Sequence, residues 1–326
     1  MCLIIMMNHS VIHHVSVMNR DIEKSFRFYH NILGLDLLLK TVNQDDVEMY
    51  HLFFSDTTGR PGTEFTIFQM TNGTDKTFGT NSIERTVFTV PSIEALYFWE
   101  KRLNEHGLFN CEIEEYNDSK ILRFEDYDGV QLGLVPLKDA GSPSDYFGRK
   151  TDDISLENAI IGIDSVHLRV RYSLATTNIL EQFFDLSVTK QLKQGEWPIT
   201  VLSQPNSFLE QEIHVIEDKQ NSLEIPGIGS SHHVALSVKD KNELNEVEAL
   251  VIDKNFINSG IKNREFFHSL YFREPHNILI EVATEEVELS KAAHESYDNA
   301  EFDDVPLALP DFLEPRRTFI EHNLFK

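Results

Sequence analysis

Cysteine is scarce in this sequence. Only Cys2 and Cys111 occur in 326 residues, so the chain cannot form a disulfide framework, and this usage is typical of a reducing compartment. Long hydrophobic runs are missing too. Residues 1–7 are apolar but too short to span a bilayer, and they lack the basic start of a signal peptide. We therefore expect a cytoplasmic protein.

Basic residues are also few. The sequence has 29 Lys and Arg against 53 Asp and Glu, a formal net charge of -24. Such a surface repels nucleic acid and anionic membranes, and no basic cluster reverses the effect. A hydrophobic share of 41% is typical of globular proteins, and the length suggests two domains. We expect small-molecule partners, with no nucleic acid or membrane partner.

One structural unit recurs four times along the chain. A strand pattern with β-branched residues at every second position begins the unit, an amphipathic helix follows, and three short strands end it. The starting strands are expected at residues 12–17, 85–90, 163–170 and 232–238. The repeat predicts an α+β fold of four tandem βαβββ modules that form two barrels or cups.

A seam between domains is expected where hydrophobic periodicity stops. Residues 139–155 are rich in Gly, Ser and Asp, as interdomain linkers often are. The predicted domains are therefore residues 1–140, with modules one and two, and residues 156–326, with modules three and four and a C-terminal segment.

Aligning the modules shows where the repeats differ. The alignment places four residues at one position of the starting strand: His14, Val87, Ser165 and His233. Residues 124–134 and 272–282 also align without a gap, and there Gly133 matches Glu281. Modules one and four therefore have coordinating side chains where modules two and three lack them.

Strand alternation puts His14, His233 and Glu281 on the face away from the helices, beside small residues. A glutamate among Ile, Leu and Val is unfavourable unless it has a partner. Two imidazoles and one carboxylate suit Fe(II), with Mn(II), Ni(II) or Zn(II) also compatible, and leave positions open for substrate and O2. The sequence predicts a metal site here. We infer a cup between modules one and four, with pairing between two chains as the alternative.

Several segments resemble those of a known family, and the likeness covers nearly the whole chain. They are residues 12–17, 50–56 with 60–63, 231–235, 269–275 with 280–284, and 307–317. The sequence resembles the glyoxalase/bleomycin-resistance/extradiol-dioxygenase (vicinal-oxygen-chelate) superfamily, and within it the enzymes that cleave hydroquinones and related dihydroxy aromatics.

That resemblance implies a non-haem Fe(II) enzyme of the extradiol type. It would insert both atoms of O2 into a hydroquinone- or catechol-type ring, with His14, His233 and Glu281 as metal ligands. It also implies catalytic roles for four further residues: His13, His232, Arg264 and Tyr271. These would hold the substrate hydroxyls, stabilise oxygen intermediates and move protons.

Two alternatives remain open. A glyoxalase-like isomerase or lyase would need a fourth ligand. The alignment puts Thr66 at that position, although a small register error would put Glu64 there. A non-catalytic protein that binds an aromatic compound or antibiotic is the second alternative, and four fused modules with a retained triad argue against it. The chain can be a monomer or a homo-oligomer, since four modules suffice to build a cup.

Other histidines are expected to have structural roles. His167 lies near the start of module three, but the alignment gives the ligand position to Ser165. Four more lack a partner in the repeats and are expected to be hydrogen-bonded or solvated: His51, His214, His268 and His276. Of these, His268 and His276 border the site strands, so a role in a pocket is open to them.

Overall fold

The computed structural model describes residues 9–108, 111–138, 146–285, 297–298 and 300–324. Four βαβββ modules follow one another, which confirms the predicted α+β class. Module one comprises β1 (Ile12–Asn19), α1 (Ile22–Phe26) continued by the π-helical η1 (Arg27–Ile32), β2 (Asp36–Val42), β3 (Tyr50–Ser55) and β4 (Glu64–Gln69). Module two comprises β5 (Ser82–Val90), α2 (Ile93–Glu105), β6 (Glu112–Tyr116), β7 (Ser119–Glu125) and β8 (Gln131–Pro136).

The second half of the chain repeats this order. Module three comprises β9 (Gly162–Val170), α3 (Ser173–Phe184), β10 (Ser187–Gln194), β11 (Trp197–Ser203), the short η3 (Phe208–Glu210) and β12 (Glu212–Glu217). Module four comprises β13 (Ser231–Val238), α4 (Lys241–Asp253), β14 (Asn258–Asn263), β15 (His268–Arg273) and β16 (Leu279–Thr284). Short turns η5 (Phe302–Asp304) and η6 (Glu314–Arg316) then lead to α5 (Arg317–Leu324).

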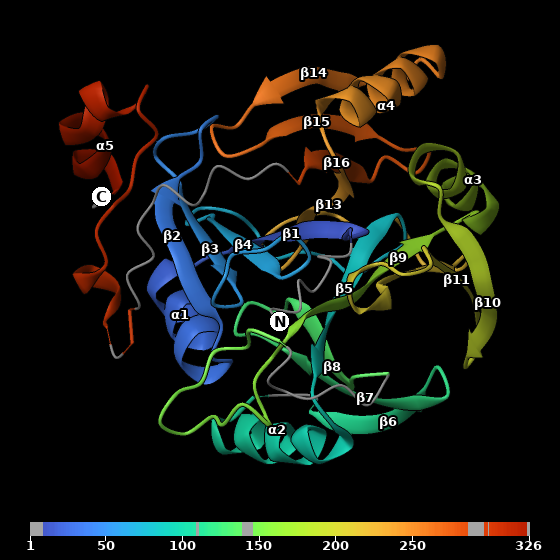
Figure 1. Ribbon diagram of the computed structural model, residues 1–326, viewed down its shortest axis with the longest axis horizontal. Helices are drawn as coiled ribbons and strands as arrows, with labels where there is room; N and C mark the ends of the chain where they lie inside the picture. The colour runs from blue at the N-terminus through green and yellow to red at the C-terminus, as the bar shows by residue number, and fades with distance from the viewer. Residues whose placement is uncertain (1–8, 109–110, 139–145, 286–296, 299, 325–326) are drawn as a thin grey trace, which may run out of the picture.

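The modules pair across the two halves of the chain. One eight-stranded sheet has the order β14-β15-β16-β13-β1-β4-β3-β2 and joins modules four and one. The other has the order β10-β11-β12-β9-β5-β8-β7-β6 and joins modules three and two. Antiparallel β1–β13 and β5–β9 pairs form the two central joints (Figure 1). Each sheet thus takes one module from each predicted domain, and the expected seam lies partly outside the described residues.

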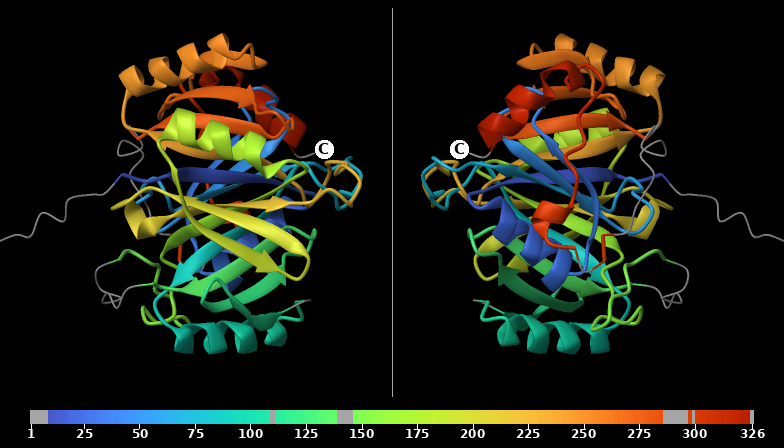
Figure 2. Two further views of the ribbon diagram at one scale, coloured as in Figure 1. Left: turned by 90° about the vertical axis from the view of Figure 1, so that its right-hand side faces the viewer. Right: turned by 90° about the vertical axis from the view of Figure 1, so that its left-hand side faces the viewer.

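Helices cover the outer faces of both sheets. In Figure 2, α4 and α2 lie at opposite ends of the molecule with the strands between them. Ser92 caps the start of helix α2, where its side chain accepts a hydrogen bond from the backbone of Ala95, and the helix buries Leu96, Trp99 and Leu103. A serine N-cap and an apolar stripe of this spacing favour an amphipathic helix packed on a sheet. In the described part of the chain, no helix is long and apolar enough to cross a membrane.

Strand pairing corrects one part of the sequence alignment. In the first sheet His233 lies opposite Ser16, two residues after His14. In the second sheet Ser165 lies opposite Val87, so the residue at the position of His14 is Arg85, two before Val87. Both sheets have register shifts at the matching places of β1 and β5, so the difference is a slip of two residues in the sequence alignment. Such a slip leaves each residue on the same face, because side chains alternate with a period of two.

A buried hydrogen-bond network connects modules one and two. The Tyr29 hydroxyl donates to Asp126 Oδ2 at 2.8 Å, and Asn19 Nδ2 donates to the same oxygen at 2.7 Å. The other carboxylate oxygen accepts from the backbone of Asp128 and Val130. A carboxylate buried between two modules needs these donors, so the network fixes how the modules pack.

Replacing Tyr29 with Phe tests this network. We expect Tyr29→Phe to lower the free energy of unfolding by about 1–2 kcal/mol, because one donor to a buried carboxylate is lost. Urea-induced unfolding measures the change. Tyr97→Phe is the matched control, since Tyr97 is 53% exposed, and it should change stability by less than about 0.5 kcal/mol. Equal effects of the two variants would contradict the role of the network.

Candidate metal centre

His14, His233 and Glu281 converge on one point inside the first sheet. They come from the adjacent strands β1, β13 and β16, where Ser16 pairs with His233 and Ala235 pairs with Glu281. His14 Nε2 lies 3.1 Å from Glu281 Oε2, His233 Nε2 lies 2.8 Å from the same oxygen, and the two nitrogens are 3.2 Å apart. All three side chains are buried.

These spacings suit ligands on one face of an octahedron. Nitrogen and carboxylate ligands lie about 2.1 Å from a divalent transition metal. At right angles, two such ligands are about 3.0 Å apart, whereas tetrahedral angles would separate them by about 3.4 Å. The observed 2.8–3.2 Å agrees with the first arrangement. Two imidazoles and a carboxylate therefore fit a metal with neighbouring positions left open.

The charges of the three groups also suit a cation. Burial alone would raise the pKa of Glu281, but His14 and His233 hold it well below its usual range, so the carboxylate is charged. Burial lowers the pKa of His233, although Glu281 opposes the shift, so the neutral imidazole is favoured. A neutral imidazole presents a lone pair, which is the form that binds metals.

Each histidine of the triad has a second histidine beside it. His13 Nδ1 lies 3.1 Å from His14 Nδ1, and His232 Nδ1 lies 2.8 Å from His233 Nδ1. A proton on Nδ1 of His14 or His233 can be donated to the neighbouring ring, which leaves Nε2 unprotonated and aimed at the centre. Both His-His pairs can thus fix the tautomer that a ligand needs.

A cavity of about 770 Å³ opens onto the triad. Of the residues implicated by sequence, His232, Arg264 and Tyr271 line it, whereas His13 lies behind His14 and does not. Arg264 Nη2 donates to Asp45 at 2.9 Å, and the guanidinium lies 5.1 Å from the centre of the Tyr271 ring. Burial and the nearby charge of Glu281 raise the pKa of Tyr271 well above its usual value, so its hydroxyl keeps its proton.

Two site residues were missed from the sequence. His51 lines the cavity, and its Nε2 lies 2.9 Å from Thr66 Oγ1. The other modules have no histidine at the matching position, so the repeats offered no reason to place His51 at the site. Strand alternation does, however, put His51 and Phe53 on the same face of β3, and both line the cavity. Phe267 packs against Ala235 and Ala283, so these small residues beside His233 and Glu281 accommodate an aromatic ring of the protein.

The position of a fourth ligand is taken by a hydroxyl. Thr66 pairs with Ser16 on β1, as Glu281 pairs with Ala235 on β13, and its Oγ1 lies 2.6 Å from Ser16 Oγ. Glu64 lies behind the triad, with its carboxylate 3.9 Å from His13 Nδ1. Burial raises the pKa of Glu64 well above its usual range, which favours the neutral acid. Among the described residues, Glu64 therefore groups with His13 and His14, away from Glu281.

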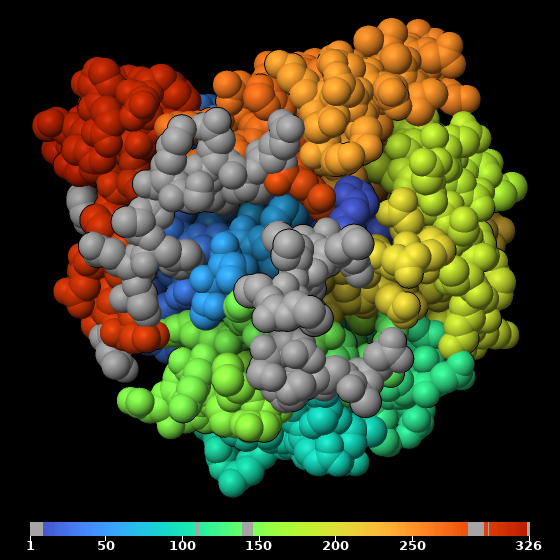
Figure 3. Space-filling model, in the orientation of Figure 1, coloured from blue at the N-terminus to red at the C-terminus, as the bar shows by residue number. Residues whose placement is uncertain are grey.

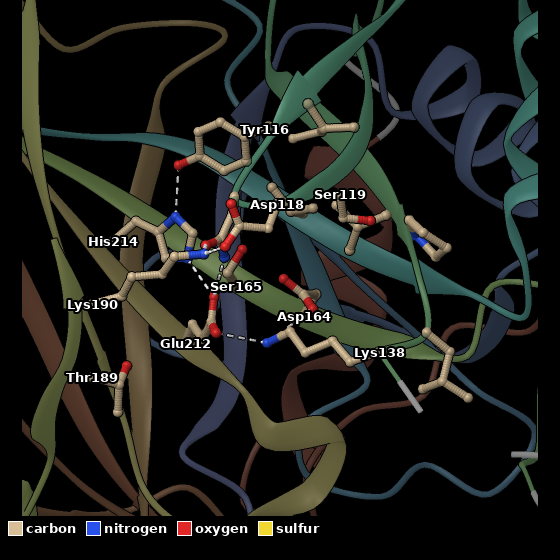
Figure 4. A pocket seen from close by; sticks show the side chains of 16 residues that line it. Tyr116, Asp118, Ser119, Lys138, Asp164, Ser165, Thr189, Lys190, Glu212 and His214 are labelled. Atoms are coloured by element: carbon tan, nitrogen blue, oxygen red, sulfur yellow. Dashed lines mark hydrogen bonds and ion pairs between the residues drawn. The ribbon is translucent and has the colours of Figure 1, made fainter. Parts of the chain in front are cut away.

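The second sheet carries no such triad in the part of the chain that the structure describes. Its cavity of about 470 Å³ is lined by Ser165 and by a polar network (Figure 4). The Tyr116 hydroxyl lies 2.7 Å from His214 Nδ1, and Glu212 accepts from Lys138 at 2.8 Å. His214 stands at the position of Glu281, and Arg85, at the position of His14, donates to the Leu132 carbonyl.

The remaining histidines lie outside the triad. His167 stacks on His214 at 4.6 Å between ring centres, within the second sheet. His276 Nε2 accepts from the backbone of Tyr172, which connects module four to module three. The His268 backbone donates to Thr284 Oγ1 at the start of β15.

Comparisons with known proteins agree with the fold and its repeats. Residues 11–134 match the model of the Glyoxalase/Bleomycin resistance protein/Dioxygenase superfamily. The chain is 34% identical over 324 residues to the "Putative ring-cleaving dioxygenase MhqA" of Bacillus subtilis (strain 168), covering 96% of this chain and 97% of that one. It is 24% identical over 279 residues to the chlorohydroquinone/hydroquinone 1,2-dioxygenase of Sphingobium indicum, covering 83% and 84% of the two chains.

Solved structures give the same result. A crystal structure of a Bacillus subtilis protein described as a dioxygenase superimposes with a TM-score of 0.83, 25% identity and 97% coverage of both chains. Glyoxalase I of Zea mays superimposes with a TM-score of 0.62 at 12% identity, covering 84% of this chain and 92% of that one, a likeness of fold alone. With its four modules and its full-length relative at 34% identity, this chain belongs to the Glyoxalase/Bleomycin resistance protein/Dioxygenase superfamily.

Proposed function

We propose that this protein is a ring-cleaving dioxygenase that uses Fe(II) to insert both atoms of O2 into a hydroquinone- or catechol-type dihydroxy aromatic. The observation that carries the proposal is the meeting of His14 Nε2, His233 Nε2 and Glu281 Oε2 within 3.2 Å at a cavity. Full-length similarity to a protein named as a ring-cleaving dioxygenase supports it. The proposed enzyme is cytoplasmic, and its partners are an aromatic substrate and O2.

Three protein ligands distinguish this reaction from its rivals. Fe(II) held by His14, His233 and Glu281 would supply an electron to O2 and binding positions for the substrate oxygens. A glyoxalase-like isomerase needs a fourth ligand, and the neutral hydroxyl of Thr66 stands at its position. A non-catalytic binding protein has no need of a buried, charged Glu281 between two imidazoles.

The chain's own groups fit the handling of a dihydroxy aromatic. Tyr271 keeps its phenolic proton and lines the cavity beside Glu281, so it can donate a hydrogen bond to a substrate oxygen that gains negative charge. Arg264 adds a positive charge next to the Tyr271 ring. His232 lines the cavity as a neutral imidazole, because desolvation and then His233 lower its pKa to about 3, so it can accept a hydrogen bond from a substrate hydroxyl.

His13 has a different role in this proposal. It is fully buried and contacts His14 Nδ1 at 3.1 Å, and it does not line the cavity. Burial and then His14 lower its pKa to about 3, so its ring stays neutral and can accept a hydrogen bond from the His14 ring. We therefore assign His13 as a positioning residue that acts through His14.

Metal binding tests the triad. We expect His233→Ala to weaken Fe(II) or Zn(II) binding by more than about 100-fold because a ligand is lost. His13→Ala should weaken it by about 10- to 100-fold because only the support of a ligand is lost. Competition with a chromophoric chelator under anaerobic conditions measures both affinities. His106→Ala, on the exposed end of α2, is the control, and wild-type affinity in His233→Ala would refute the assignment of the ligands.

Oxygen consumption tests the reaction. The chain loaded anaerobically with Fe(II) should consume one O2 per hydroquinone or catechol cleaved, and ¹⁸O2 should label the ring-opened product with two heavy atoms. His233→Ala should reduce uptake to the background rate, while His106→Ala should retain it. An electrode and mass spectrometry provide the two measurements.

The same assay separates the rival functions. Turnover of an isomerase substrate without O2 would support the glyoxalase-like alternative. Binding of aromatics with no uptake across a broad set of dihydroxy aromatics would support the non-catalytic one. Either result would reject the dioxygenase proposal.

A further inference from the structure

The cavity above the triad is larger than a simple ring requires. Its volume is about 770 Å³, within the range of sites that enclose drug-sized ligands. A dihydroxybenzene has only about eight non-hydrogen atoms, far fewer than such ligands. If the dihydroxy end of a substrate lies at His14, His233 and Glu281, most of the cavity is left for something attached to the ring.

Apolar side chains line part of the cavity, beside polar ones that include Thr41, Asn43 and Gln44. The apolar side chains come from segments that are distant in sequence: Leu39 and Val42 on β2, Phe266 between β14 and β15, and Leu309 with Pro310 near the C-terminus. Val42 forms a small apolar cluster with Leu313 and Ile320, and Leu309 packs against this cluster. Apolar walls of this kind favour a hydrocarbon substituent by removing its surface from water.

The rim of the cavity opposes negatively charged substituents. Three carboxylates line it, those of Asp45, Glu265 and Asp311, against the two cations Lys262 and Arg264. The Arg264 guanidinium is already paired with Asp45 at 2.9 Å. A carboxylate on the substrate would thus meet a rim with a net charge of about -1 (two minus three), on a chain whose formal charge is -24, and would be repelled.

The C-terminal wall is fixed by hydrogen bonds. The Ala308 backbone N–H donates to the Lys40 carbonyl on the edge strand β2, and the Asp311 backbone N–H donates to Glu265. Arg317 Nη1 on α5 donates to the Leu307 carbonyl. Figure 1 shows this segment running alongside β2, and Figure 3 shows it in red at one edge of the surface. Leu309 and Pro310 are therefore a built part of the cavity.

We propose that the site takes a dihydroxybenzene with an extended, uncharged apolar substituent, such as an alkyl chain of several carbons. This inference rests on the proposed function. The two hydroxyls lie at the triad, and the substituent packs against Leu39, Val42, Phe266 and Leu309. The C-terminal segment sets this specificity, because it contributes the wall that completes the apolar part of the cavity.

A substrate series tests the proposal with the Fe(II)-loaded chain. The series comprises hydroquinone, methyl-, butyl- and hexylhydroquinone, and a dihydroxybenzoate. We expect kcat/KM to rise by about two- to fourfold per buried methylene until the cavity is filled, and the dihydroxybenzoate to be the poorest substrate. A flat or falling trend with chain length, or a preference for the carboxylate, would overturn the proposal.

A variant pair assigns the effect to the C-terminal wall. Leu309→Asp should lower the ratio of kcat/KM for hexylhydroquinone to that for hydroquinone by more than about tenfold, because it puts a charge against the chain. Phe312→Asp is the matched control on the same segment, since Phe312 is 60% exposed and does not line the cavity, and it should leave the ratio unchanged. Equal ratios in both variants would contradict a wall at Leu309.

Binding without turnover separates this proposal from the proposed reaction. Anaerobic calorimetry of the Fe(II)-loaded chain with 4-methyl-, 4-butyl- and 4-hexylphenol should show affinity rising with chain length, and Leu309→Asp should remove the trend. If affinity rises with chain length but no hydroquinone causes O2 uptake, the substituent site is supported and the proposed dioxygenase reaction is rejected. Uptake with no dependence on chain length in either assay would retain the dioxygenase and reject the substituent site.

Discussion

The site depends on the antiparallel pairing of β1 with β13. This ladder places His14 and His233, which are 219 residues apart in sequence, with their Nε2 atoms 3.2 Å apart, and the parallel neighbour β16 adds Glu281. Two imidazole lone pairs and a carboxylate gathered in a buried place repel one another unless a proton or a cation lies between them. A metal at this point would relieve that repulsion, so the proposed ion would stabilise the arrangement that the ladder creates.

The second sheet shows that the fold alone does not create a need for a metal ion. It has the same strand order and the same central antiparallel joint, but it places Arg85, Ser165 and Gly133 where the first sheet has His14, His233 and Thr66. His214 occupies the position of Glu281 and is satisfied by Tyr116 and Glu212. A polar network that provides its own partners needs no ion. The two halves of the protein thus differ in chemistry through a few positions on a shared scaffold.

Much of this architecture could be predicted from the sequence because it repeats. The modules and the α+β class follow from hydrophobic periodicity, and the triad follows from comparing His14 with His233 at one position of two repeats. The strand register was harder to predict, since a slip of two residues, such as the one that put Val87 in place of Arg85, leaves every residue on the same face of the strand. The roles of His51 and Phe267 were also missed. Strand alternation places His51 on the cavity side of β3, but its contact with Thr66 and the packing of Phe267 on Ala235 and Ala283 are tertiary contacts, which no local pattern encodes.

The two edge strands of the first sheet lead into segments that meet beside the proposed metal site. Strands β2 and β14 are the two edges, and the segments that follow them meet where Gln44 donates to the Arg264 carbonyl and Arg264 donates to Asp45. Arg264 therefore joins the two rims of the cup while its guanidinium lies over Tyr271 beside Glu281. A change at Asp45, which is far from the triad in the chain, would alter both the closure of the cup and the position of that charge. Arg264 thus takes part both in the contact between the two rims and in the electrostatics of the proposed site.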